Sequence, residues 1–174
     1  MVKILTHSRL FKFASVPDKV YSALRRGLPI HYVIERYGIK PYAAEKFDFN
    51  VILDEGASAI WSLLTGSTSV TPFDNSHSYI GVGDGTEPED PSQTGLTGTN
   101  KYYKLVDSGY PMISGRCIVF RATFDTNEAN FSWNEWTIAN GPSDDAINLN
   151  RKQVSMGTKQ LGEIWVLNIT LCIE

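Results

Sequence analysis

Residues 120–140, FRATFDTNEANFSWNEWTIAN, limit the possible folds of this chain more than any other segment. Two apolar runs flank the turn-rich linker DTNEAN, and this arrangement predicts an antiparallel β-hairpin. Side chains point alternately to the two faces of a strand, so Trp133 and Trp136 are expected on opposite faces. A strand with a large apolar ring on each face needs cover on both sides. We therefore predict a central strand, with one face in the domain core and the other under a helix, a loop or another subunit.

Further alternating segments indicate that most of the chain folds as β-strands. They lie at residues 78–83, 101–106, 116–124, 131–140, 149–156 and 163–173. Loops rich in Gly, Pro, Asp and Asn separate them, which is typical of β-sandwiches and barrels. The most regular core stripe lies in the last segment: Trp165, Leu167, Ile169, Leu171 and Ile173. The predicted fold class is mainly β, an antiparallel β-sandwich or jelly-roll-like domain with one packed helix and a basic N-terminal arm containing short helices.

The clearest helix is predicted over residues 54–66, DEGASAIWSLLTG, after a strand candidate at residues 47–53. Asp54 is the expected N-cap and Gly66 the C-terminal glycine. The expected buried stripe is Ala57, Ile60, Trp61 and Leu64. Two shorter helices are predicted within residues 16–29 and 31–37, the second closed by Gly38. Neither is long enough to be stable without a partner surface.

The charge distribution divides the chain into a basic segment and an acidic remainder. Residues 1–47 carry a formal charge of +6 and the remainder −9, although the whole chain carries only −3. We predict a docking arm, residues 1–46, joined to a β-sandwich domain, residues 47–174. The arm is expected to begin as an extended segment or a short strand and to contact its own domain, another copy or a different acidic protein. Nucleic acid is disfavoured, since the segment has no dense Lys/Arg tract. The expected docking residues are Lys3, Arg9, Lys12, Arg25, Arg26 and Arg36.

Two cysteines are too few for a disulfide framework. Cys117 and Cys172 fall on the more polar face of their predicted strands, where they could be cross-strand neighbours. A reduced cytoplasmic pair is the favoured interpretation. No apolar run approaches the roughly 18 residues that cross a bilayer, and the N-terminus lacks the pattern of a secretory signal. We therefore expect no membrane contact.

The acidic loop GDGTEPEDP, residues 83–91, is the first candidate for chemistry. It brings Asp84, Glu87, Glu89 and Asp90 close together in sequence, and such oxygen ligands can hold Ca²⁺. The spacing is not that of an EF-hand, and a solvated loop is favoured over a cation site. The three histidines are scattered, without metal-ligand spacing. We predict no cofactor and no metal.

Glu135, between two tryptophans, is the second candidate. A carboxyl group beside aromatic rings can act as the acid of a glycosidase, but a second carboxylate is then required. Structural packing is favoured, with a cross-strand ion pair to Arg151 as one form of it. Sugar binding without catalysis stays open, through exposed Trp136, Tyr102 or Tyr103. No catalytic residue is predicted.

Several motifs occur in a fixed order between Val51 and Leu171: EANFSWNEW, LNRK followed by GTK, and a closing W-x-L-x-I-x-L strand. In this series the chain resembles a widespread group of small virion structural proteins of tailed bacteriophages, variously described as tail, collar-fibre or head-decoration components. The resemblance implies a non-enzymatic virion protein, assembled in the host cytoplasm. Its expected partners are copies of itself, as a trimer or ring, and a major capsid, neck or tail protein. An accessory of the head or neck, anchored by its arm, is favoured. The alternative is a tail fibre or baseplate component with a carbohydrate-binding β-domain.

Overall fold

The computed structural model describes residues 4–174 as two five-stranded antiparallel sheets packed face to face. The first sheet has the order β2-β1-β10-β7-β6, and the second β3-β9-β8-β4-β5. The prediction of a β-sandwich is confirmed. The strands of the first sheet are β1 Ile4–Phe13, β2 Ala43–Asp48, β6 Met112–Ser114, β7 Cys117–Phe124 and β10 Ile164–Ile173. Those of the second are β3 Val51–Ile52, β4 Tyr79–Gly83, β5 Lys101–Leu105, β8 Ser132–Ala139 and β9 Asn148–Thr158.

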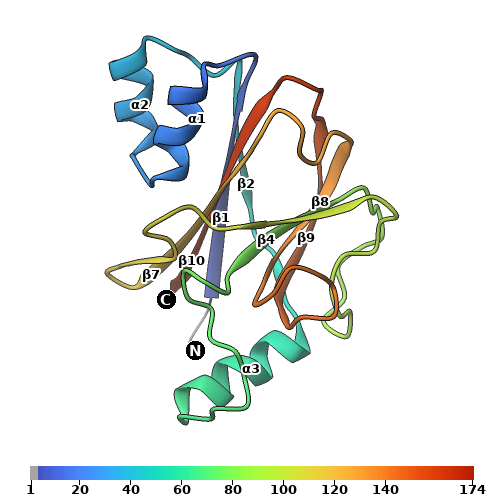
Figure 1. Ribbon diagram of the computed structural model, residues 1–174. Helices are drawn as coiled ribbons and strands as arrows, with labels where there is room; N and C mark the ends of the chain where they lie inside the picture. Colours follow the sequence, from blue (N-terminus) through green and yellow to red (C-terminus); the bar gives the residue numbers. More distant parts are fainter. Residues whose placement is uncertain (1–3) are drawn as a thin grey trace.

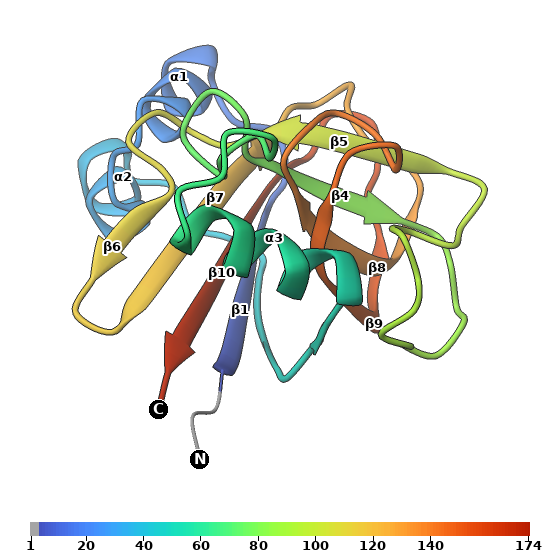
Figure 2. The ribbon, with the colours of Figure 1, turned by 90° about the horizontal axis from the view of Figure 1, so that it is seen from below.

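Three short helices complete the described chain: α1 Asp18–Arg25, α2 Ile30–Tyr37 and α3 Asp54–Leu64. Figures 1 and 2 show α1 and α2 together at one end of the sandwich and α3 at the other, near the chain termini. Gly38 ends α2 in the left-handed conformation, with φ 63°, as its position after the helix predicts. None of the helices among the described residues has the length and apolarity to span a membrane.

The core lies between the two sheets and is built from the inner faces of their long strands. The predicted stripe of β10 is confirmed as far as Leu171, since Trp165, Leu167, Ile169 and Leu171 all belong to this core. Trp133 of β8 packs edge-on against Phe124 and Trp165, with ring centroids 4.7 and 4.8 Å apart. Such aromatic contacts add to the free energy gained by burying the rings. These rings tie the second sheet to the first.

β8 is the middle strand of its sheet, as predicted. Trp133 and Trp136, however, both belong to the core between the sheets, so the prediction that they face opposite sides is wrong. The reason is a register shift between β8 and β9 at Trp133/Glu135. A bulge of this kind breaks the two-residue alternation of a strand. On the outer face of β8 the covered residue is Glu135, whose side chain is fully buried.

The N-terminal segment forms part of the sandwich and is not an arm beside it. β1 pairs with β10 through ten consecutive residues, from Ile4↔Ile173 to Phe13↔Ile164, and β2 pairs with the other edge of β1. Helices α1 and α2 cover the outer face of the first sheet and form a second apolar cluster with Phe13, Ile164 and Val166. The predicted helices are thus confirmed, but the predicted boundary at residue 46 falls inside β2 and so divides one structure. Short helices with an apolar face are stabilised by this kind of packing.

Helix α3 packs against β9 by a face that differs in part from the one predicted: Ile60 packs against the core as expected, but Trp61 and Leu64 do not. Its buried residues are Gly56 and Ala59, whereas Trp61 and Leu64 are 65% and 74% exposed. A Cβ atom on Gly56 would lie 2.2 Å from the carbonyl oxygen of Leu149, so only glycine permits this approach. The expected N-cap, Asp54, is instead the first residue of the helix. The N-cap position is Leu53, and no side chain forms a capping hydrogen bond there. The small residues of α3 set its orientation because they let its backbone contact β9.

Candidate functional site

The pair Glu135–Arg151 is a structural lock and not an open catalytic site. Both side chains are fully buried, and an Arg151 guanidinium nitrogen lies 2.6 Å from a carboxylate oxygen of Glu135. The carboxylate also accepts hydrogen bonds from the backbone N–H groups of Gly85, Thr97 and Gly98, at 2.8–3.1 Å. The predicted cross-strand pair is confirmed. It fastens the β4–β5 loop over the outer face of β8.

The acidic loop residues bind separate partners within the chain. Asp84 accepts hydrogen bonds from Asn100, and Asp90 from Ser92. Glu89 accepts from the backbone N–H of Gln153, and this bond lowers the pKa of its carboxyl group although desolvation opposes it. Among residues 4–174, no three His, Cys, Asp or Glu side chains group as metal ligands would. The loop carboxylates organise the loop and β9.

A second buried ionic cluster, which the sequence did not indicate, joins helix α1 to the first sheet. Asp107 is fully buried and accepts hydrogen bonds from Arg25 at 2.6 Å and Arg121 at 2.8 Å. Arg121 donates in turn to the carbonyl oxygens of Leu24 and Leu28, at the end of α1. This cluster fixes the helix pair on the sheet. A buried charge without a partner would lower the stability of the fold, and here the carboxylate and the two guanidinium groups compensate one another. No local spacing reveals it, since its members lie in three separate segments.

The residues proposed to contact sugar are largely inside the protein. Trp136 is 0% exposed, so its ring is not available for stacking on a ligand. Tyr102 is half-buried and packs against Phe124, with ring centroids 6.2 Å apart. The hydroxyl of Tyr103 donates to Asp144, and burial raises the pKa of this phenol. The prediction of an exposed aromatic contact at Trp136 is wrong, because the bulge turns its ring into the core.

The basic residues predicted to dock separate into internal and surface groups. Lys12 is buried, with its ammonium 2.5 Å from Glu45 and 4.5 Å from the centroid of the Trp165 ring. Arg25 belongs to the Asp107 cluster. Three of the predicted residues are exposed: Arg9, Arg26 and Arg36. Lys3 lies outside the described residues.

A polar groove of about 470 Å³ occupies the part of the first sheet's outer face that α1 and α2 leave open. Arg9 stands opposite Lys46 on β2 and opposite Asn168 on β10. His7 and Lys46 lie 2.6 and 3.3 Å from the carboxylate of Asp48. The groove is lined by His7, Arg9, Lys46, Tyr110, Val119, Asn168 and Thr170. Its side chains can bind anions or hydroxyl groups.

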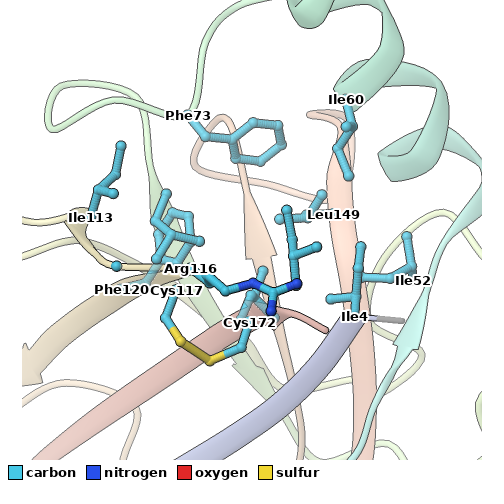
Figure 3. Close-up of a pocket in the computed structure, with 14 residues that line it drawn as sticks. Ile4, Ile52, Ile60, Phe73, Ile113, Arg116, Cys117, Phe120, Leu149 and Cys172 are labelled. Carbon is cyan, nitrogen blue, oxygen red and sulfur yellow. A yellow bond between two sulfur atoms is a disulfide. The ribbon is translucent and has the colours of Figure 1, made fainter. Parts of the chain in front are cut away.

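The most apolar surface feature is a cleft of about 400 Å³ at the end of the sandwich where β1 begins and β10 ends. It opens between the first sheet and the α3–β9 side of the second, as Figure 3 shows. Arg116 provides the charged group of a lining that is otherwise apolar or glycine. The lining consists of Ile4, Ile52, Ile60, Phe73, Ile113, Gly115, Arg116, Cys117, Ile118, Phe120, Leu149, Leu171, Cys172 and Ile173.

A disulfide lies at the edge of this apolar cleft, on the outer face of the first sheet. Cys117 and Cys172 are directly opposite in the β7–β10 register and are joined by an S–S bond. The expectation of a reduced pair is wrong, and the cross-strand alternative is what the structure shows. Strand spacing brings opposed Cβ atoms to within the range that a disulfide requires. The cleft itself is assembled from seven separate parts of the chain, so no sequence pattern marks it.

No family model, curated protein or solved structure matches the chain.

Proposed function

We propose that this protein is a non-enzymatic structural subunit of a tailed bacteriophage particle, an accessory of the head or neck that docks on an acidic neighbour. The observation that carries the proposal is the location of the exposed cations. Arg9, Arg26 and Arg36 remain on the surface: Arg9 lies on the sheet face, Arg26 directly follows α1, and Arg36 lies on α2. We call this side of the first sheet, with its two helices, the basic face. Its partner would be a capsid, neck or tail protein with a complementary negative surface.

Cross-strand geometry supports an anionic partner at the basic face. Arg9 and Lys46 are directly opposite on neighbouring strands, an arrangement that is unfavourable for like charges. Asp48 pairs with Lys46, whereas Arg9 forms no ion pair with any carboxylate among residues 4–174. A carboxylate from a partner would offset this repulsion.

The scaffold supports a structural role. Glu135, the best candidate for an enzymatic acid, is held by an arginine and several backbone N–H groups, and it is closed off from solvent. The oxidised cysteine pair agrees with a protein whose final location is outside the reducing cytoplasm, as on a virion surface. The protein would then assemble in the host cytoplasm with reduced cysteines, and the disulfide would form in the released particle.

Charge reversal tests the proposal better than truncation does. The triple variant Arg9→Glu, Arg26→Glu, Arg36→Glu should keep its fold and its melting temperature, because all three side chains are exposed. Supplied in trans to a phage that lacks the gene, it should be lost from purified particles when these are quantified by mass spectrometry. Arg116→Glu is the control for charge reversal itself, since it places one such substitution at the other end of the sandwich. Incorporation of the triple variant at the level of the native protein would refute docking through the basic face.

Self-association as a trimer or ring is part of the same proposal. Closed symmetry is the usual arrangement of identical subunits. Light scattering coupled to size-exclusion chromatography should give a mass at least three times the 19.4 kDa of one chain. A monomer at all concentrations would remove the ring from the proposal and leave docking on a different protein.

A second candidate function is a carbohydrate-binding component of a tail fibre or baseplate. The polar groove favours it, because Arg9, Asn168 and Tyr110 combine a charged group, an amide and an aromatic ring on one face. A glycan array with the native protein and with Asn168→Ala would test this function. Binding that the substitution does not alter would place any sugar site elsewhere.

A further inference from the structure

The apolar cleft at the disulfide end is open to solvent and has no cover among residues 4–174. Its rim carries exposed aliphatic side chains: Ile113 is 79% exposed, Ile173 52% and Ile4 39%. Its volume, about 400 Å³, lies within the range of small-molecule sites. Contiguous exposed apolar surface of this kind usually marks a binding site, because water contact with it is unfavourable.

Arg116 gives the cleft its polarity. Figure 3 shows its side chain extending across the cleft from the β6–β7 hairpin, with the guanidinium toward Leu149 and Ile4. The guanidinium forms no ion pair with any carboxylate among the described residues. A guanidinium binds a planar carboxylate through two parallel hydrogen bonds. The cleft therefore joins a large apolar surface to one cation without a protein counter-ion.

We propose that this cleft binds a single-chain amphiphile with a carboxylate head group, of the fatty-acid class. The aliphatic chain lies against the side chains of Phe120 and Leu149, and the head group pairs with Arg116. Each methylene group removed from water favours binding, while the charge pair selects the head group and sets the orientation of the chain.

A second copy of the protein fits the cleft less well. In a two-fold contact the same patch meets itself, so two copies would bring Arg116 of each to one interface. The residues that line the cleft include no Asp or Glu to compensate these charges. Like charges at an interface oppose association. An anionic amphiphile carries a charge opposite to that of Arg116, and its aliphatic chain can cover the apolar lining.

The test uses the full chain, oxidised, and two probes that differ only in head group: decanoate and decanol, titrated by calorimetry below their aggregation concentrations. Decanoate should bind more tightly than decanol. Arg116→Gln should weaken decanoate binding about fivefold, as expected for an exposed charge pair, and leave decanol unchanged. Arg36→Gln, an exposed arginine on α2, is the matched control and should leave both affinities unchanged. Ile113→Asp, at an exposed rim position, should weaken decanoate more than Arg116→Gln does.

Three results would overturn the proposal. The first is the absence of binding for either probe, and the second is equal affinity for both probes with no effect of Arg116→Gln. The third is a dimer in light scattering that Ile113→Asp abolishes and decanoate does not displace, because a second copy would then occupy the cleft. None of these results affects docking through the basic face, which the particle experiment tests separately.

Discussion

Replacing Glu135 by glutamine removes one negative charge from the interior and changes the shape of the side chain little. In the native protein this carboxylate compensates Arg151, which has no exposed side-chain surface. It also accepts hydrogen bonds from the backbone N–H groups of Gly85, Thr97 and Gly98. Glutamine keeps one acceptor oxygen but places an NH₂ group where the carboxylate accepted hydrogen bonds. The substitution therefore leaves the charge of Arg151 uncompensated. It also places the NH₂ group of the glutamine opposite backbone N–H donors.

The expected loss of unfolding free energy is about 3–5 kcal/mol, the cost of breaking a buried ion pair by removing one partner. A whole domain is stable by only about 5–15 kcal/mol, so the variant should remain folded but marginal. For a chain of 174 residues, each kcal/mol corresponds to roughly 2–4 °C in melting temperature. The melting temperature should fall by about 10 °C. Amide exchange in the loop of residues 84–98 should speed up most, since the carboxylate fastens that loop.

Urea denaturation followed by circular dichroism measures the change. Asp48→Asn is the control, because Asp48 forms its ion pairs on the surface, and its midpoint should stay close to that of the native protein. Adding Arg151→Met to Glu135→Gln removes the uncompensated charge, so the double variant should lose less than the sum of the two single variants. A loss below about 1 kcal/mol for Glu135→Gln would refute the assignment of this pair as a structural lock.

Three further predictions concern other parts of the sandwich. Deletion of residues 1–46 should leave an unfolded chain by circular dichroism, because it removes β1, most of β2 and both helices on the first sheet; a folded product would show that residues 1–46 form an independent arm. Replacing Cys117 and Cys172 by alanine should lower the unfolding free energy by about 2–4 kcal/mol, since their bond closes a loop with a sequence separation of 55, and an unchanged urea midpoint would contradict this. Burial lowers the pKa of Lys159 to about 8 from 10.5, so the folded protein binds fewer protons than the unfolded chain between these values. This group's contribution to unfolding free energy should therefore rise with pH over that window, and NMR titration of its ε-carbon should give a midpoint near 8 and not above 10.

Sequence alternation determined the fold class because each strand must bury one row of side chains. The stripe of β10 could be read directly, since its core positions from Trp165 to Leu171 are all large and apolar. The pairing of Glu135 with Arg151 could also be anticipated, because a charged group in an apolar strand needs a partner from the neighbouring strand. Local signals of this kind are carried by residues near one another or in adjacent strands.

β1 shows where such signals fail. Two of its inward positions hold Thr6 and Ser8, which are buried through hydrogen bonds to Asn50 and to the carbonyl of Phe47. These polar residues hide the alternation and made a strand of the first sheet look like a basic arm. Burial of a polar group depends on its partner, and here the partner lies about forty residues away.

The features that bear on function depend on the tertiary structure and could not be predicted from the sequence. The bulge between β8 and β9 placed Trp136 in the core, and the small residues of α3 left Trp61 exposed. The register of β7 against β10 joined Cys117 to Cys172 and brought Arg116 beside an apolar cleft. Which segments are strands could be predicted from the sequence, since that depends on side chains two residues apart. Register and close backbone approach depend on contacts between distant segments, so only the folded chain could settle which surfaces are open.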